Sequence, residues 1–379
     1  MKNTKQINYN RLNRIISKIV YKVGILSEEN ENTFPYGKDL SSTEWVRTEH
    51  CDWSGGYWIG LLLGAYEETN DISFLDKIKA LLPKIDARLT DEDEFLGFIF
   101  YYSYAILYDK FRREEYKNAA LKAANKLVSM YNHSAQMIPL GKNCKILGTA
   151  ISGENIVGVD NAIIPNILLY WAYDKTKNQN YLEVAKRNLD SILNNLVRNN
   201  GSTEHMLEFD QSGKITKVWN NLGYKTGTTW ARGLAWTLLS LVYAIDYFNE
   251  IKYLKLYIKS LKYYISKSIN HSMLTYYDTE DPRIPNVPID TTSLTISAEA
   301  YILSYENGLV DGYMLPIFYR SILQNLDLDN DNDIILKHGC FDYPRSYLVD
   351  ADLIFSDYYA MDFFIRLRKI VARGDWNGK

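Results

Sequence analysis

The feature that most constrains the fold of this chain is a helical hairpin unit that recurs along the sequence. In each unit an apolar helix runs to a tyrosine, a short polar turn follows, and a second helix carries its apolar residues on one side. A helix that is apolar all round is expected to be buried, whereas a one-sided apolar stripe leaves the other face in solvent. The units begin at Trp58, Phe98, Ile164, Leu234 and near Thr292, and a last helix begins around Asp357. The pattern predicts an all-α protein.

Inner apolar and outer amphipathic helices in five or six repeats are typical of hairpins around a ring, although a linear solenoid uses the same units. The units differ in length, and long polar segments at 132–155 and 200–228 precede inner helices, which favours a ring with loops at one end. No linker rich in Pro, Gly or Ser breaks the pattern. We therefore predict a single (α/α)₆ toroid, a glycoside-hydrolase-like domain over residues 1–379, whose loops form a cleft and include a short β-hairpin at 204–216.

Composition narrows the class of partner. The formal net charge is only −3, from 43 basic and 46 acidic residues, so a nucleic-acid partner is not expected. Aromatic residues make up 14% of the chain, and flat rings with polar edges suit a carbohydrate cleft. Three scattered cysteines and five histidines predict neither a disulfide framework nor a metal site, and no cofactor is indicated.

The N-terminal segment, MKNTKQINYNRLNRIISKIVYKVGIL, is predicted to be an amphipathic helix rather than a signal peptide, since it has no uninterrupted apolar stretch. No apolar run is long enough to span a membrane, so we expect a cytoplasmic protein without a membrane partner. The oligomeric state is not indicated.

Three clusters stand directly before inner helices, where helix ends would line the cleft. They combine aromatic residues, glycine and a charged group, and they read DWSGGYW at 52–58, GVDN at 158–161 and TTWARGLAW at 228–236. Helix capping and core packing explain any one of them equally well. Their equivalent places in successive hairpins favour a shared binding pocket.

Asp160 is the sharpest single candidate for catalysis, because it lies at the start of a strongly apolar helix. Loss of hydration there raises the pKa of a carboxyl group toward the range of a general acid. Backbone donors at a helix start act in the opposite direction, because they favour the ionised form. The sequence leaves the outcome of this competition open.

Two further side chains are candidate substrate ligands. Arg232, between Trp230 and Trp236, is able to fork onto a substrate carboxylate, but a structural Arg–Asp pair in the ring is the alternative. His205, in the predicted hairpin loop, is a candidate partner for a hydroxyl or carboxylate. The acidic runs at 91–94 and 327–333 are interpreted as solvated loops, and the second lacks the Gly and Glu of a calcium-binding EF-hand loop.

These residues together resemble the unsaturated glucuronyl hydrolases, glycoside hydrolase family 88. The resemblance runs from about Glu49 to Leu367 and rests on segments in the family order, of which TTWARGLAW is the most specific: DWSGGYW, Asp160 with its apolar helix, HMLEFD at 205–210, TTWARGLAW and SDYYAMDFFIRL. It implies an (α/α)₆ barrel, in agreement with the hairpin count. It also implies that the partner is an oligosaccharide ending in a uronic acid.

The resemblance further implies a reaction and a set of roles. The family removes the 4,5-unsaturated uronic acid that polysaccharide lyases leave at a nonreducing end, by hydrating the vinyl ether. An aspartic acid donates a proton at C4 and then deprotonates the water that adds at C5, and by resemblance this residue is Asp160. Trp53 and Trp236 would then lie near the sugar ring, with Trp230 beside them, while His205 and Arg232 would hold polar groups of the substrate.

Three departures from the family pattern bear on activity. Phe95 occupies the place of a second aspartate of the family. One possibility is that Glu94 or Asp93 reaches the same place after a local shift. Otherwise the pocket lacks a charge that helps to set the catalytic pKa. A His-Gln-Gly motif reads Asn-Leu-Gly at 221–223. A Ser-Tyr-His stretch reads Cys-Phe-Asp at 340–342, where Asp342 is expected to repel a substrate carboxylate.

Three hypotheses for the function follow. The first is a hydrolase that hydrates an unsaturated uronic acid, with Asp160 as both acid and base. The second is a non-catalytic or glycan-assembly protein that has kept the sugar cleft, as the missing second aspartate suggests. The third is an epimerase on the same toroid, which the scattered histidines do not favour.

Overall fold

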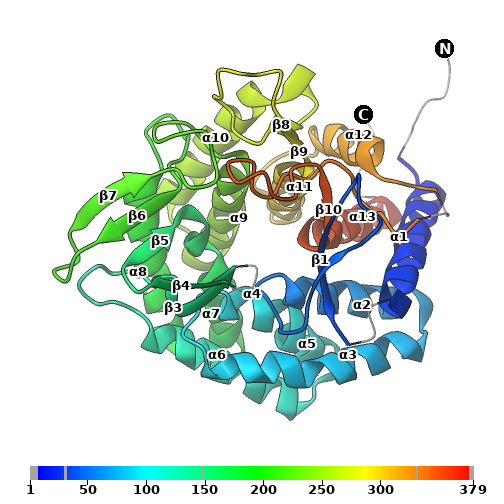
Figure 1. The fold of residues 1–379 in the computed structure, drawn as a ribbon, viewed down its shortest axis with the longest axis horizontal. Helices are drawn as coiled ribbons and strands as arrows, with labels where there is room; N and C mark the ends of the chain where they lie inside the picture. The colour runs from blue at the N-terminus through cyan, green and yellow to red at the C-terminus, as the bar shows by residue number, and fades with distance from the viewer. Residues whose placement is uncertain (1–6, 30–31, 147–148, 330–331, 375–379) are drawn as a thin grey trace.

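The helices form two concentric layers, which the computed structural model shows end-on in Figure 1. The structure describes residues 7–29, 32–146, 149–329 and 332–374. In this part of the chain the inner layer contains α2 (Gly55–Thr69), α4 (Leu96–Phe100) with a π-helical turn (Tyr101–Ala105) into α5 (Ile106–Phe111), α7 (Ile164–Thr176), α9 (Ala231–Phe248), α11 (Thr291–Glu306) and α13 (Ile354–Arg373). The outer layer contains α1 (Tyr9–Glu29), α3 (Ile72–Asp86), α6 (Glu114–Ser129), α8 (Gln179–Leu196), α10 (Ile251–Lys267) and α12 (Leu315–Asn325).

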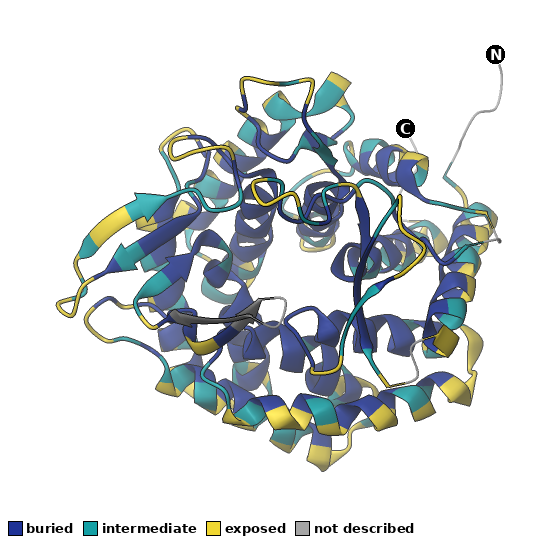
Figure 2. Ribbon diagram, viewed as in Figure 1, coloured by how far each residue is buried: buried dark blue, intermediate teal, exposed yellow. Residues whose placement is uncertain are grey.

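Burial separates the two layers as the apolar patterns predict. The inner helix α9 is buried on all sides from Ala231 to Val242, and α11 is buried from Thr291 to Ile302. The outer helix α3 buries only a stripe of residues, Phe74, Ile78, Leu81, Leu82 and Ile85, at helical spacing. In Figure 2 the inner helices are mostly dark blue, whereas the outer ones carry exposed yellow residues on one side.

Several hairpins turn in the same way. After α2, α5, α7 and α9 a single left-handed residue, with φ between 50° and 58°, ends the inner helix. The next residue is extended and begins the outer helix. Where that residue is Asp71 or Asn178, its side chain accepts a hydrogen bond from a backbone N–H of the new helix. A two-residue turn of this kind forces neighbouring helices to run antiparallel.

The ring is closed by the two ends of the chain. The first helix, α1, packs on the last helix, α13, which itself lies between α2 and α11. Arg368 of α13 ties them together, because it donates to Asn13 of α1 and forms an ion pair with Glu68 of α2. The predicted N-terminal amphipathic helix and the predicted all-α toroid are thus confirmed. That the toroid is one domain over 1–379 stays a prediction.

Strands occupy the end of the ring that faces the viewer in Figure 1. Their bounds are β1 (Phe34–Asp39), β2 (Val46–Thr48), β3 (Gly141–Ile146), β4 (Thr149–Gly153), β5 (Ile156–Gly158), β6 (Met206–Phe209), β7 (Ile215–Trp219), β8 (Thr275–Tyr276), β9 (Ile289–Asp290) and β10 (Ala351–Leu353). They form small antiparallel sheets in the orders β10-β1-β2, β3-β4, β5-β6-β7 and β8-β9.

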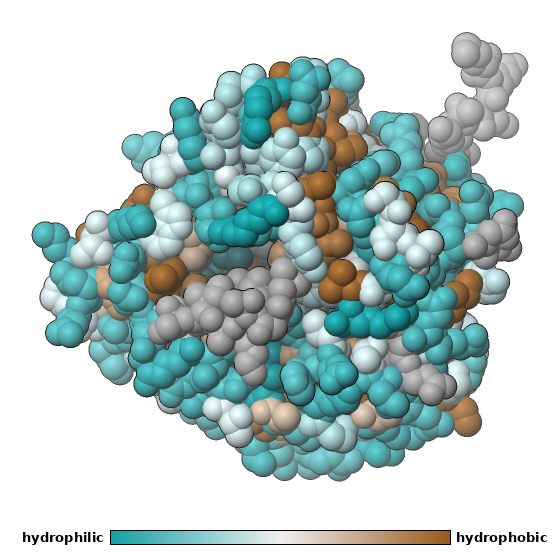
Figure 3. All heavy atoms as spheres, in the orientation of Figure 1, coloured by the Kyte–Doolittle hydropathy of each residue, from teal (hydrophilic) through white to brown (hydrophobic). Residues whose placement is uncertain are grey.

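The predicted hairpin at 204–216 is confirmed as β6 and β7, with Met206 opposite Trp219. The segment at 132–155, in contrast, was predicted as a loop without strands, but β3 and β4 lie within it. Long segments over a ring leave many backbone groups unpaired, and antiparallel pairing satisfies them. The space-filling view of this end shows hydrophobic residues near the middle of an otherwise hydrophilic face (Figure 3).

The prediction that the acidic run at 327–333 is a solvated loop is wrong in its described part. Asp333 is buried and accepts hydrogen bonds from Nζ of Lys38 (2.7 Å) and from the indole of Trp45 (2.7 Å). Asp327 pairs with Lys22, a buried lysine of α1. The run therefore fastens the C-terminal loops to the first elements of the chain. Residues 330 and 331 lie outside the described residues.

Of the described helices, none combines the length and the apolar character needed to cross a bilayer.

Candidate active site

A pocket of about 230 Å³ lies at the strand-bearing end of the ring, since residues of β5, β6 and β7 line it. All seven side chains proposed from the sequence, Asp160, Trp53, Glu94, His205, Trp230, Arg232 and Trp236, line it. The remaining lining residues are Phe95, Phe98, Leu140, Ile156, Ile164, Met206, Trp219, Asn221, Leu222, Phe341 and Arg345. Most of them are apolar or aromatic, so the few polar groups act in a weakly hydrated setting.

Asp160 stands on a 3₁₀ turn (Val159–Ala162) between β5 and α7. Its carboxyl group faces the pocket and remains partly accessible. Burial raises its pKa to about 6, against the opposing effects of backbone N–H groups and of the Arg232 charge. Its neighbour Asn161 is fully buried and accepts from the N–H of Gly158 (2.7 Å) and donates to the carbonyl of Ile138 (3.1 Å). Asn161 is therefore structural, and Asp160 is the residue presented to a ligand.

The acidic run at 91–94 is also not the solvated loop that was predicted. Asp93 is fully buried and pairs with Arg88, and it accepts from the backbone N–H of Phe95 (2.9 Å). It does not line the pocket. Glu94, in contrast, is a pocket residue, and its Oε2 has no hydrogen-bond partner among the described residues. Of the two acids that were candidates to replace the missing aspartate, the geometry favours Glu94.

Glu94 is expected to be protonated near neutral pH. Burial raises its pKa well above the ordinary range, and the negative charges of Asp160 and Asp93 add to the effect. A protonated carboxyl group is a hydrogen-bond donor. Phe95, the residue at the aspartate position, packs its ring 5.7 Å from that of Trp53 and supplies apolar wall instead of charge.

His205 is held as a neutral ring. Its Nδ1 accepts from the backbone N–H groups of Asn221 (3.3 Å) and Leu222 (3.2 Å), so Nε2 carries the proton. Burial, together with the charges of Arg232 and Arg345, lowers its pKa to about 3. The histidine is thus a neutral donor at the pocket wall. A neutral histidine suits the binding of a substrate hydroxyl group. It does not supply the positive charge that would bind a substrate carboxylate.

Arg232 is engaged by the protein itself. Its Nη1 donates to the carbonyl of Cys340 (2.6 Å) and its Nη2 to the carbonyl of Phe341 (2.7 Å). Asp290 lies 3.6 Å from Nη1, and the guanidinium stacks 4.6 Å from the ring centre of Trp230. The structural Arg–Asp pair, the alternative weighed for this residue, is present. The other role, binding of a substrate carboxylate by Arg232, stays a prediction.

The three predicted tryptophans form the aromatic floor and walls. Trp53 donates its indole N–H to Tyr36 (3.0 Å), and its ring lies 6.4 Å from that of Phe341 in a stacked arrangement. Trp230 is sandwiched between His205, at 4.4 Å, and the Arg232 guanidinium. Trp236 packs on Phe98, at 5.3 Å, deeper in the ring.

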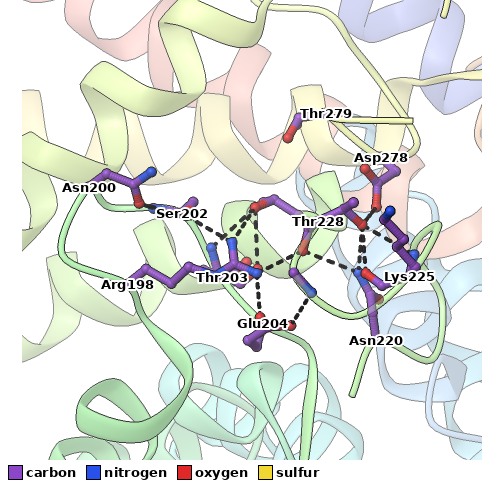
Figure 4. A network of polar contacts seen from close by, with 12 residues as sticks. Arg198, Asn200, Ser202, Thr203, Glu204, Asn220, Lys225, Thr228, Asp278 and Thr279 are labelled. Carbon is purple, nitrogen blue, oxygen red and sulfur yellow. Dashed lines mark hydrogen bonds and ion pairs between the residues drawn. The ribbon is translucent and has the colours of Figure 1, made fainter. Parts of the chain in front are cut away.

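A polar network holds the loop that carries Trp230, as Figure 4 shows. Thr228 donates to Asp278 (2.7 Å), and Asp278 also accepts from the N–H of Tyr224 (2.8 Å). On the other side Arg198 donates to Thr229 (3.2 Å) and pairs with Glu204 (2.6 Å). The residues come from loops far apart in the sequence, and together they fix the segments that flank His205 and Trp230.

Sequence reasoning missed two functional candidates of the pocket rim. Trp219, the last residue of β7, lines the pocket and remains partly exposed. Arg345, in the loop before β10, also lines it. An alternating strand or a lone arginine in a polar loop carries no local signal of this role, because only the folded loops bring them together.

The described residues contain no group of three or more His, Cys, Asp or Glu side chains arranged to hold a metal ion. The fold and the site together define a helical toroid whose one end presents an acid of raised pKa in an aromatic pocket.

Comparison with known proteins specifies the relatives of this toroid. No family model matches the chain. Curated relatives include the unsaturated chondroitin disaccharide hydrolase of Streptococcus pyogenes serotype M1, which is 24% identical over 87% of this chain and 83% of its own length. The unsaturated glucuronyl hydrolase of Formosa agariphila is 23% identical over 96% of this chain and 91% of its own length.

Solved structures agree on the fold. The unsaturated glucuronyl hydrolase of Streptococcus agalactiae matches with a TM-score of 0.86 at 21% identity, over 99% of this chain and 95% of that one. The enzyme of Bacillus sp. GL1 matches with a TM-score of 0.84 at 20% identity, over 95% and 97% of the two chains. The predicted resemblance to the unsaturated glucuronyl hydrolases is confirmed, and the low identity makes this chain a distant relative of those proteins.

Proposed function

We propose that this protein removes a 4,5-unsaturated uronic acid from the nonreducing end of an oligosaccharide, by hydration of its vinyl ether with Asp160 as acid and base. The observation that carries the proposal is a single carboxyl group with a pKa of about 6 at the wall of an apolar pocket. The enzyme class is supported by the curated relatives, which are named as hydrolases of unsaturated chondroitin disaccharides or as unsaturated glucuronyl hydrolases.

The proposed reaction adds one water molecule across the C4–C5 double bond. Protonated Asp160 donates its proton to C4, and the positive charge that develops at C5 is shared with the ring oxygen. The Asp160 carboxylate then takes a proton from water, whose oxygen bonds to C5. The resulting hemiketal opens and releases the shortened saccharide, and Asp160 regains the proton it donated.

The electrostatics distinguish the two carboxyl groups of the pocket, Asp160 and Glu94. Glu94 is held protonated by burial and by the nearby charges. It is therefore proposed as a donor to substrate oxygen atoms, together with Nε2–H of His205, and Asp160 alone exchanges protons.

The dimensions of the pocket support a single bound sugar unit. Pockets for drug-sized ligands measure roughly 300–1,000 Å³, and this one measures about 230 Å³. Trp53, Trp230 and Trp236 provide the aromatic surface against which a sugar ring would pack. The rest of the oligosaccharide would then extend past Trp219 at the rim.

The alternative, a non-catalytic sugar-binding protein, rested on the missing second aspartate. The apolar residue Phe95 takes the position of that aspartate, but Glu94 supplies a carboxyl group to the same pocket. The relatives also favour the enzyme over this alternative.

The test is to incubate the purified protein with several unsaturated uronyl disaccharides and to follow the absorbance of the conjugated C4–C5 bond. We expect the absorbance to fall, and we expect Asp160→Asn to abolish the change, because an amide cannot supply the proton. Asp246→Asn, at an exposed aspartate of α9, is the matched control. Calorimetric binding of these sugars without turnover would instead support the non-catalytic alternative.

A further inference from the structure

The two carboxyl groups of the pocket stand on different loops. Asp160 lies on the 3₁₀ turn that follows β5, and Glu94 lies just before α4. A short segment, residues 138–140, bonds to both loops. The carbonyl of Leu140 accepts from the N–H of Glu94 (3.0 Å), and the N–H of Leu140 donates to the carbonyl of Ile156 in β5 (2.9 Å). This segment therefore links the positions of the two acids.

The segment at 138–140 is itself fixed by asparagine side chains. The N–H of Ile138 donates to Oδ1 of Asn188 (2.8 Å), and the carbonyl of Ile138 accepts from Nδ2 of Asn161 (3.1 Å). Asn161 follows Asp160 on the turn, whereas Asn188 belongs to the outer helix α8. Both polar backbone groups of one residue are thus held by amides, one from the turn and one from the outer layer.

Asparagine side chains also hold the 3₁₀ turn at both of its ends. At the first end, Oδ1 of Asn161 accepts from the N–H of Gly158 (2.7 Å). At the last end, Nδ2 of Asn166 in α7 donates to the carbonyl of Ala162 (3.0 Å). Asn188 joins the two, because its Nδ2 donates to the carbonyl of Asn161 (2.9 Å) and to Oδ1 of Asn166 (3.2 Å). The three asparagines therefore form one network around the turn.

The three amides lie in a place that apolar side chains usually fill. Asn161, Asn166 and Asn188 are fully buried, and the buried neighbours of Asn188 on α8 include Val184 and Leu189. A buried amide is tolerated when its nitrogen and its oxygen both have partners, and all three meet this condition. Apolar side chains fill such a space without this requirement, but they impose no direction on a neighbouring backbone. The network therefore serves placement of the turn rather than packing alone.

The network lies behind the pocket and not in it. Neither Asn166 nor Asn188 is among the residues that line the pocket. The ionisable side chains that line it together with Asp160 are Glu94, His205, Arg232 and Arg345. A substitution at Asn188 therefore keeps every charged group of the pocket and changes only where the turn holds its carboxyl group.

We propose that Asn188, together with Asn161 and Asn166, is a positioning residue that holds Asp160 in its place relative to Glu94 and the bound sugar. This inference rests on the proposed function, and it gives a residue of the outer layer a role in the reaction. Asn188 acts through the backbone of the turn and through the segment at 138–140. It does not contact the substrate.

The experiment compares Asn188→Leu with the wild type, because leucine has the same branching without the amide. We expect kcat to fall by about ten- to a hundredfold, since a small displacement of a reacting group is costly, while KM stays within about threefold. A looser turn also admits water to Asp160. The pH above which kcat/KM declines should therefore shift down by about half a unit or more. The measurement is the absorbance assay on one unsaturated disaccharide from pH 4.5 to 8.5.

Asn325→Leu is the matched control, because Asn325 is a buried asparagine of the outer helix α12 whose amide donates to the carbonyl of Ser321 (2.8 Å). It should leave kcat and the pH profile unchanged, whatever its effect on the free energy of unfolding. Asn188→Asp should recover most of the kcat at pH 5, because a buried carboxyl group that keeps its proton both donates and accepts. Wild-type kcat and pH profile in Asn188→Leu would overturn the proposal, however much stability the variant loses.

If Asn188→Leu does not fold, Asn166→Ala replaces it as the test. This variant removes the bond to Ala162 and the acceptor of Asn188, but it keeps both bonds to Ile138. We expect a smaller loss of kcat, about three- to tenfold, with a pH shift in the same direction. A variant that matches the wild type in both would refute the positioning role.

Failure of the proposed function is recognised separately, since the wild type would then turn over none of the unsaturated disaccharides. In that case the pKa of the Asp160 carboxyl group is measured by carbon-13 NMR, with Asp160→Asn to assign its signal. In the wild type we expect a pKa of about 6. A lower value in Asn188→Leu would uphold the positioning role without catalysis, and equal values in the two proteins would refute it.

Discussion

Asp160 is subject to two opposing influences, and their balance sets the chemistry of the pocket. The backbone donors of its 3₁₀ turn and the charge of Arg232 favour the carboxylate, whereas burial among apolar side chains favours the acid. Burial prevails, so a substantial fraction of the group keeps its proton at mildly acidic pH. The sequence exposed both influences but not their magnitudes, because these depend on how the loops from other hairpins cover the turn.

This balance predicts the pH dependence of the reaction. With a pKa of about 6, Asp160 is protonated below that pH and loses its proton above it. Because the protonated form donates to C4, kcat/KM should fall above about pH 6, by about tenfold per pH unit. The measurement is kcat/KM from pH 4.5 to 8.5 on one disaccharide. A profile that stays level up to pH 8 would exclude Asp160 as the proton donor in the free enzyme.

Gly158 controls the position of the Asp160 carboxylate. Its backbone conformation (φ −96°, ψ 162°) suits any residue, but a Cβ atom there would overlap Oδ1 of Asp160. We expect Gly158→Ala to lower kcat by about a hundredfold through misplacement of that carboxylate. The free energy of unfolding should change by only about 1 kcal/mol or less.

The matched control for this prediction is Gly24→Ala in α1, where the added atom would have its nearest neighbour 4.0 Å away. It should leave kcat unchanged. Kinetics and urea denaturation on the two variants separate an effect on position from an effect on folding. A large loss of stability with unchanged kcat in Gly158→Ala would contradict the assignment.

At the scale of elements, the inner helices owe their placement to the loops that precede them. The segment before α4 is an example, because the buried guanidinium of Arg88 reaches the carbonyl of Cys51, Asp91 (2.7 Å) and Asp93. It thereby connects the start of α2 with the start of α4 and positions Glu94 next to Asp93. The acidic run at 91–94 was predicted to be a solvated loop because the sequence does not show which residues pair with it and bury it in the folded protein.

Arg88→Ala should therefore be costly. It would remove the guanidinium that pairs with the fully buried carboxylate of Asp93, and removal of one member of a buried pair costs about 3–5 kcal/mol. Lys79→Ala, which breaks an exposed pair with Asp76, should cost about 0.5 kcal/mol or less. Urea denaturation of both variants at pH 7 is the measurement. Similar small losses in the two would show that the Arg88 network contributes little to stability.

At the scale of the whole molecule, closure of the ring brings together charges from opposite ends of the chain. Asp352 of β10 and Asp357 of α13 are fully buried side by side, beneath the loop that Lys22 of α1 holds. Asp352 accepts from the N–H of Ile335 (2.5 Å). Burial raises the pKa of Asp352 to about 7 and that of Asp357 well above its ordinary range, the latter also through the charge of Asp352.

These raised pKa values predict that stability falls with pH. An unfolded aspartate releases its proton near pH 4, whereas the folded pair keeps its protons to about pH 7 and beyond. Between these values folding takes up protons, so the pair contributes stability at low pH that is lost as pH rises, by up to about 1.4 kcal/mol per pH unit for each proton. The free energy of unfolding should thus decline from pH 5 to pH 7.

Asp357→Asn tests this coupling, because an amide donates to Asp352 without needing a bound proton. The variant should show a weaker decline with pH and should be more stable than the wild type at pH 8. Asp246→Asn, at an exposed position, should follow the wild-type profile. Urea denaturation at several pH values gives the slopes. Identical slopes in all three proteins would show that the pair does not share protons as inferred.

The sequence by itself determined the helical hairpins, their inner and outer layers, and Asp160 with its three tryptophans, because apolar periodicity and clusters before helices are local properties of the chain. Only the tertiary structure decided that Arg232 is occupied, that Glu94 brings a carboxyl group into the pocket beside Phe95, and that Arg345 lines the pocket. The bond between Arg345 and Asn221 spans 124 positions, and the pKa of Asp160 depends on loops from several hairpins. Charge and hydration in a pocket are set by everything around it in space, and a linear pattern does not contain that information.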